Sequence, residues 1–217
     1  MAMKLRVPFT KTIIKSTMFE QFVGGTTLLK SQKSIDRLWS NNVQSILDYG
    51  AEAKESEKDF NMTMNENIRA IEFAATNKSA PVISTKITGL ARFELLEAIQ
   101  KDEVLNKKTK SEFRNVLKRV DSICHVAAEN GVGVFIDAEE SWIQDTIDHI
   151  TDVMMKRYNK ERVVVYNTFQ MYRKDRLQFL MDSFEKSKKD GYLLGAKLVR
   201  GAYMEKERIR AGEMGYV

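Results

Sequence analysis

Four short runs rich in β-branched residues alternate with long helical patterns after Pro81, and this alternation constrains the fold more than any other feature. The runs are PVISTKITGL from residue 81, GVGVFIDAEE from 131, RVVVYNTFQ from 162 and LLGAKLVRGAY from 193. Strands separated by helices pair in parallel, because each crossover helix lies over the sheet and returns the chain to the same end. The sequence therefore predicts an α/β fold with a parallel sheet.

A helical pattern occupies residues 10 to about 80. Apolar residues recur at steps of three and four in SIDRLWSNNVQSILDYGAEA and again in MTMNENIRAIEFAATN, which is typical of amphipathic helices. The residues that form these two stripes are Ile35, Leu38, Trp39, Val43, Ile46, Leu47, Met64, Ile68, Ile71 and Phe73. We predict a helical segment over residues 1–80, followed by about four βα units over residues 81–217.

Composition excludes several classes of protein. Lys and Arg total 35 against 30 Asp and Glu, a net charge of +5, and acidic residues are interleaved throughout, which argues against a nucleic-acid partner. Cys124 is the single cysteine, so no intramolecular disulfide forms, and with two histidines no metal-ligand spacing exists. Cys124 lies in VDSICHVAAENG, which predicts a helix that buries it and ends at Gly131.

The first 22 residues carry several basic residues and no acidic residue before Glu20. We interpret them as a first helix lying on the surface. A transit peptide is the alternative, although no apolar stretch followed by a cleavage site is present.

Polar residues follow each apolar run. They are Lys86 after the first, Asp137, Glu139 and Glu140 after the second, Asn167 and Gln170 at the third, and Arg200 and Tyr203 after the fourth. The carboxyl ends of parallel strands meet at one edge, where ligands bind both in (β/α)₈ barrels and in doubly wound sheets. No GxGxxG follows a strand, which argues against a dinucleotide site of the Rossmann type.

Each of these residues alone has a structural explanation. Lys86 can extend to solvent, Asp137 can cap the next helix, and Gln170 can bind loop backbone. Four polar strand ends at one edge favour a ligand site instead. Lys86 and Asp137 on neighbouring strands would present a cation and an anion to one cavity, an arrangement suited to a small zwitterion.

Four segments together resemble the proline dehydrogenase family in its monofunctional, FAD-dependent form. In chain order they are STMFEQFVGG, FIDAEESW, VYNTFQMYRKDRL and KLVRGAYMEKERIRA. The resemblance implies a distorted (β/α)₈ barrel, of which this chain holds the first half. It also implies noncovalent FAD, oxidation of L-proline to Δ1-pyrroline-5-carboxylate, and membrane quinone as the electron acceptor. For a bacterial protein the resemblance implies a location in the cytoplasm or in peripheral contact with the inner membrane. For a eukaryotic protein it implies a location in the mitochondrion.

The resemblance also assigns roles to individual residues. Lys86 falls on the lysine that binds the substrate carboxylate, Asp137 on a catalytic strand-end aspartate, and Tyr203 on a catalytic tyrosine that flanks the substrate. The residues that fall on cofactor-binding positions are Ala138, Gln170, Lys197, Arg200, Gly201 and Ala202. The family's later strands, with a Tyr and an Arg pair that complete the proline pocket, are absent, so we expect the segment alone to be inactive.

Two other functions stay open on the sequence alone. In the first, the chain is a non-catalytic half-barrel that assembles with another half. In the second, it belongs to a barrel enzyme in which the Lys86 amine forms a Schiff base and Asp137 acts as its acid–base partner.

Overall fold

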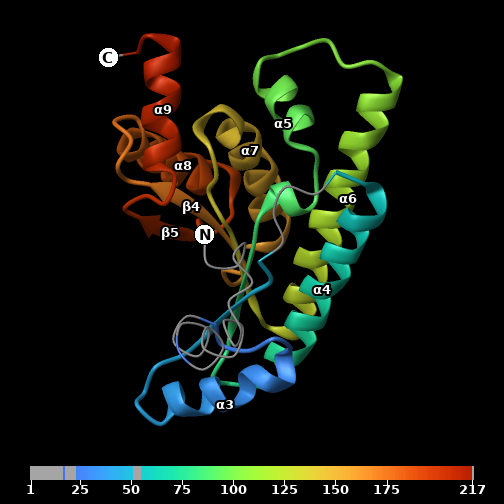
Figure 1. Cartoon of the computed structure of the whole chain (residues 1–217), viewed down its shortest axis with the longest axis vertical. Helices are drawn as coiled ribbons and strands as arrows, with labels where there is room; N and C mark the ends of the chain where they lie inside the picture. The colour runs from blue at the N-terminus through green and yellow to red at the C-terminus, as the bar shows by residue number, and fades with distance from the viewer. Residues whose placement is uncertain (1–16, 18–22, 51–54, 217) are drawn as a thin grey trace, which may run out of the picture.

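The computed structural model describes residue 17, residues 23–50 and residues 55–216, so the predicted surface helix near the N-terminus lies almost wholly outside the described part of the chain. The helices are α3 (Leu28–Trp39), α4 (Glu57–Ala75), α5 (Phe93–Gln100), α6 (Lys107–Asn130), α7 (Ser141–Tyr158), α8 (Arg176–Asp190) and α9 (Met204–Met214), with a 3₁₀ turn, η1 (Ile87–Gly89). The strands are β1 (Ile46–Asp48), β2 (Val82–Thr85), β3 (Gly133–Ile136), β4 (Val165–Gln170) and β5 (Ala196–Val199) (Figure 1).

The five strands form one parallel sheet in the order β1-β2-β3-β4-β5. Each strand is hydrogen-bonded to its neighbour along the chain, so every crossover advances in the same direction across the sheet. The α/β class and the four strands predicted after Pro81 are confirmed. Closure into an eight-stranded barrel stays a prediction.

Strand β1 corrects the helical pattern predicted over residues 34–53. Helix α3 ends at Trp39, where Ser40 Oγ and Asn41 Nδ2 both donate hydrogen bonds to the Arg37 carbonyl (2.8 and 2.9 Å), and Asn42 has a φ of 59°. These short polar side chains offer the backbone partners outside the helix, and so end it. Residues 46–48 then pair with residues 82–84. Among the described residues the sheet therefore has five strands where four were predicted, and one of them lies inside the segment expected to be helical.

Side-chain caps and glycines set the helix ends. The Ser56 hydroxyl accepts from the Asp59 amide at the start of α4, and the Asn106 carboxamide oxygen accepts from the Thr109 amide at the start of α6. Helix α6 ends at Gly131 with φ 72°, the left-handed conformation that glycine adopts without a Cβ clash. The predicted end of this helix is confirmed.

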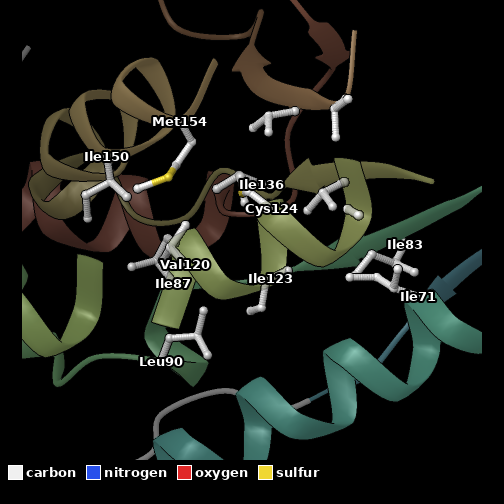
Figure 2. Packing of buried hydrophobic residues seen from close by; sticks show 14 of the residues in the cluster. Ile71, Ile83, Ile87, Leu90, Val120, Ile123, Cys124, Ile136, Ile150 and Met154 are labelled. Atoms are coloured by element: carbon white, nitrogen blue, oxygen red, sulfur yellow. The ribbon is translucent and has the colours of Figure 1, made fainter. Parts of the chain in front are cut away.

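The core lies between the sheet and helices α4, α6 and α7, as Figure 2 shows from close by. Cys124 is fully buried there beside Ile123 and Ile136, and burial raises the pKa of its thiol. The cysteine is therefore a packing residue, as predicted. Labelled members of this core are Ile71, Ile83, Ile87, Leu90, Val120, Ile123, Cys124, Ile136, Ile150 and Met154.

The two faces of the sheet differ because successive strand residues point to opposite sides. The transverse row of Leu47, Ile83, Val134 and Val165 is buried against the helices. In the next row, Phe135 and Tyr166 are half-buried on the other face, with ring centroids 4.9 Å apart. Asp137 continues the alternation on this second face. No helix within the described ranges is long and apolar enough to cross a membrane.

A candidate ligand site at the carboxyl ends of the strands

Lys86 and Asp137 lie at neighbouring strand ends, as the sequence predicts. Thr85 pairs with Ile136 at the end of the β2–β3 ladder, and the Asp137 amide then donates to the Thr85 carbonyl (2.9 Å). Lys86 keeps an extended backbone (φ −111°, ψ 140°) immediately before η1, and both side chains are half-buried. The register therefore holds these two ionisable residues side by side.

Asp137 pairs with a lysine from β5. Lys197 Nζ lies 2.6 Å from Asp137 Oδ1 and 5.3 Å from the centroid of the Phe135 ring. The two side chains are 26% and 18% exposed, so the pair is open to a ligand while partly shielded from water. Thr168 on β4 pairs with Lys197, which means that the Lys197 side chain crosses β4 to reach the end of β3.

Glu139 is a buried carboxyl behind Lys86. It is 2% exposed, its Oε1 accepts from the Thr88 amide (3.0 Å), and its Oε2 accepts a short hydrogen bond from the Thr88 hydroxyl. Burial is the largest effect and raises the pKa of Glu139 to about 7, against the opposing effects of the Thr88 hydrogen bonds and the positive charge of Lys86. A carboxyl of this kind exchanges its proton near neutral pH.

Gln170 has one half of its carboxamide fixed. Its Nε2 donates to the Glu139 carbonyl at 2.6 Å, while its buried Oε1 accepts no hydrogen bond from any residue in the described ranges. The residue is 1% exposed, and Ala138, on the same loop as Glu139, is 7% exposed. Gln170 thus binds loop backbone, which is the structural role that the sequence allowed for it. Its Oε1 also offers an acceptor to an N–H group of a ligand. A buried polar atom without a partner is uncommon in native proteins.

The turn after β5 carries the remaining predicted residues. Gly201 has a φ of 123°, and a Cβ at this position would overlap the ring of Tyr172. Both the backbone conformation and the close ring require glycine here. Arg200, Gly201 and Ala202 are exposed, and Tyr203 is half-buried with Lys206 Nζ 5.2 Å from its ring centroid.

Helix α9 is bound to the start of α7. The Glu207 carboxylate accepts from both the amide and the hydroxyl of Ser141 (2.7 Å each), and Lys206 pairs with Glu140 at 2.5 Å. The carboxylate thus occupies the positive N-terminus of α7. A cleft of about 320 Å³ beside these contacts is lined by Ser141, Tyr172, Met204, Glu207, Arg208, Arg210, Ala211 and Tyr216.

A buried ion pair lies behind the site, and the sequence pattern did not reveal it. Arg176, at the start of α8, and Asp148, on α7, are 4% and 5% exposed, and their charged atoms are 2.5 Å apart. Gln144 on α7 links this pair to Glu139. The available signal was the spacing of Gln144 and Asp148, which are four residues apart and share one face of a helix.

The model of the family described as "Proline dehydrogenase" matches residues 31–217. The chain belongs to the proline dehydrogenase family. Among curated proteins it is 30% identical over 187 residues to the carbapenem antibiotics biosynthesis protein CarD of Pectobacterium carotovorum, covering 86% of this chain and 50% of that protein. It is 44% identical over 112 residues to the mitochondrial proline dehydrogenase 1 of Caenorhabditis elegans, covering 52% of this chain and 18% of that protein.

Hydroxyproline dehydrogenase of Xenopus laevis is 27% identical over 235 residues, covering 94% of this chain and 50% of that protein. This member of the proline dehydrogenase family thus spans about half the length, or less, of these curated relatives. Its fold is similar to that of proline utilization A from Bdellovibrio bacteriovorus inactivated by N-propargylglycine, with a TM-score of 0.79 at 18% identity. That match covers 95% of this chain and 22% of the other.

Proposed function

We propose that this chain carries part of the substrate and cofactor site of an FAD-dependent proline dehydrogenase, which oxidises L-proline to Δ1-pyrroline-5-carboxylate in the first step of proline catabolism. Family membership supports the reaction class. The observation that carries the site is the meeting of Lys86, Asp137, Lys197 and Gln170 at one edge of the sheet. Ligands bind at this edge in barrels and in open parallel sheets.

The residues present fit an isoalloxazine and its phosphates. Gln170 Oε1 is a buried acceptor without a partner among the described residues, and oxidised isoalloxazine offers a single ring N–H donor. Exposed Arg200 follows β5 and can bind phosphate. The residues that would hold FAD are Ala138, Gln170, Lys197, Arg200, Gly201 and Ala202. When bound, FAD supplies the acceptor for the hydride that leaves proline C5.

The chain's own groups bind and orient proline. Lys86 binds the proline carboxylate as a point charge, since its ammonium lacks the paired donors of arginine. The incoming ammonium first loses a proton to water, so that the amine is neutral when the hydride leaves C5, and the remaining N–H proton passes to water as the C=N bond of the product forms. Asp137 balances the positive charge of Lys197 and of the incoming amine at this edge, and Tyr203 flanks the pyrrolidine ring. Orientation and charge balance are thus the tasks of the protein.

Membrane quinone is the electron acceptor in this proposal, reached by peripheral contact with the inner membrane in a bacterium, and a eukaryotic source would place the protein in the mitochondrion. We further propose that turnover requires strands and substrate contacts beyond those of this segment. Two facts support this: the chain spans half or less of its curated relatives, and β1 and β5 each have one paired edge in the described sheet.

The test uses the full-length protein that contains this segment. We expect the purified protein to be yellow, to release FAD on denaturation, and to lose its visible absorbance when L-proline is added without oxygen. D-Proline serves as the control. Turnover that requires NAD, with no flavin released, would contradict the proposal, and a borohydride-trapped carbonyl on Lys86 would identify a Schiff-base enzyme instead.

A further inference from the structure

A directed series of hydrogen bonds connects the buried ion pair to Gln170. Arg176 Nη1 donates to Asp148 Oδ2 (2.5 Å), and Asp148 Oδ1 accepts from Gln144 Nε2 and from Asn167 Nδ2 (2.9 Å each). Gln144 Oε1 then accepts from the Glu139 amide at 2.8 Å. The Glu139 carbonyl accepts from Gln170 Nε2 at 2.6 Å. The series begins on α8, crosses α7 and ends on β4.

Arg176 and Asp148 fix the orientation of the Gln144 carboxamide, and the Glu139 carbonyl fixes that of the Gln170 carboxamide. Arginine has only donors, so the Asp148 carboxylate accepts from it, and a carboxylate has only acceptors, so Gln144 must turn its Nε2 towards Asp148. The Oε1 of Gln144 is left to face the Glu139 amide. The Glu139 carbonyl in turn accepts from Nε2 of Gln170. Since a carbonyl only accepts, Gln170 presents its oxygen as the atom without a partner among the described residues.

Burial makes this orientation costly to reverse. Gln144, Gln170, Asp148 and Arg176 are 0%, 1%, 5% and 4% exposed, so water does not compensate a broken hydrogen bond. Flipping Gln144 would place its carboxamide oxygen against the Asp148 carboxylate and its NH₂ against the Glu139 N–H. Both contacts are repulsive and buried. One amide orientation is therefore strongly preferred along the series.

We infer that Gln144, held by Asp148 and Arg176, is a positioning residue that holds the Glu139 backbone in place, and through it the Gln170 carboxamide that faces the flavin. This inference rests on the proposed function for the identity of the ligand. Gln144 itself lies on α7 and acts through the backbone of Glu139, whose amide it binds and whose carbonyl binds Gln170. Its removal is expected to leave the fold intact and to release the Gln170 carboxamide.

The first experiment needs no FAD. The full-length protein labelled with ¹⁵N-glutamine is compared with Gln144→Met, which keeps the side-chain length and leaves the ion pair intact. Thr151→Val is the matched control, since Thr151 is also fully buried on α7 and its hydroxyl bonds within the helix to the Ile147 carbonyl (2.8 Å). We expect hydrogen exchange of the Gln170 side-chain amide to rise about tenfold in Gln144→Met and to stay unchanged in the control.

If Gln144→Met does not fold, Gln144→Glu replaces it, because this variant keeps an acceptor for the Glu139 amide and removes the donor to Asp148. A rise in Gln170 exchange is expected here as well, because the new carboxylate is repelled by Asp148 and moves away from the Glu139 amide. Equal Gln170 exchange in the Gln144 variant and in Thr151→Val would overturn the inference.

The second experiment measures FAD binding by the apoproteins through quenching of flavin fluorescence. The dissociation constant for FAD should rise about tenfold in Gln144→Met relative to Thr151→Val, whereas KM for proline at saturating FAD should not change. An unchanged dissociation constant would also overturn the inference. If the wild-type protein binds no FAD, the proposed function fails, and the exchange comparison still decides whether Gln144 positions Gln170.

Discussion

Replacing Glu139 with glutamine should remove a large part of the pH dependence of stability. The carboxyl accepts two hydrogen bonds from Thr88, one from the amide and one from the hydroxyl. In Glu139→Gln, the carboxamide oxygen keeps the bond from the Thr88 amide, and its NH₂ donates to the Thr88 oxygen. The substitution therefore removes the buried charge while the number of hydrogen bonds is preserved.

The magnitude follows from the pKa of Glu139, which burial raises from 4.5 to about 7. Between these two values the folded protein binds more protons than the unfolded chain, so the free energy of unfolding falls as pH rises through this window. The total loss is at most about 3 kcal/mol and is complete above pH 7. Below pH 4.5 the carboxyl is protonated in both states, and this loss is absent.

The assay is urea denaturation of the full-length protein at pH 4.5, 6 and 8, with exposed Glu161→Gln as the control. Glu139→Gln should be more stable than wild type by up to about 3 kcal/mol at pH 8 and by little at pH 4.5. The control should follow the wild-type profile. An identical pH slope in wild type and Glu139→Gln would refute the reasoning, because Glu139 would then ionise in the folded protein as it does in the unfolded chain.

Three further predictions concern the site and the segment. In steady-state assays, Lys86→Met should mainly raise KM for L-proline, whereas Asp137→Ala should lower kcat/KM. Each substitution should cost about 2–4 kcal/mol of binding or transition-state free energy, and wild-type kinetics in either variant would show that the residue has a structural role only. Gly201→Ala should lower stability by about 1–3 kcal/mol in thermal melts, because a Cβ strains φ 123° and meets Tyr172; an unchanged melting temperature would contradict this. Residues 1–217 alone should aggregate or self-associate in light scattering and should bind FAD weakly in a titration, because open sheet edges favour pairing; a monomer that binds FAD at micromolar Kd and reduces it with proline would refute this.

Local patterns determined much of the fold. Four strands and the helices between them follow from short β-branched runs and from apolar residues at steps of three and four, because periods of 2 and 3.6 directly decide which side chains meet the core. Gly131 ends α6 as predicted, since the left-handed conformation is a property of that residue. The neighbouring positions of Lys86 and Asp137 also followed, because parallel strands end at the same edge.

Contacts between distant segments decided the rest. Residues 46–48 have a helical pattern and form a strand because β2 supplies their hydrogen-bond partners. Lys197 reaches Asp137 only because β4 sets the spacing between β3 and β5. Asp148 and Arg176 lie in charged stretches that resemble solvent-exposed helix faces, and they are buried because α7 and α8 bring their opposite charges together. Sequence periodicity reports which face a side chain occupies, whereas the partner of a buried charge is set by tertiary packing.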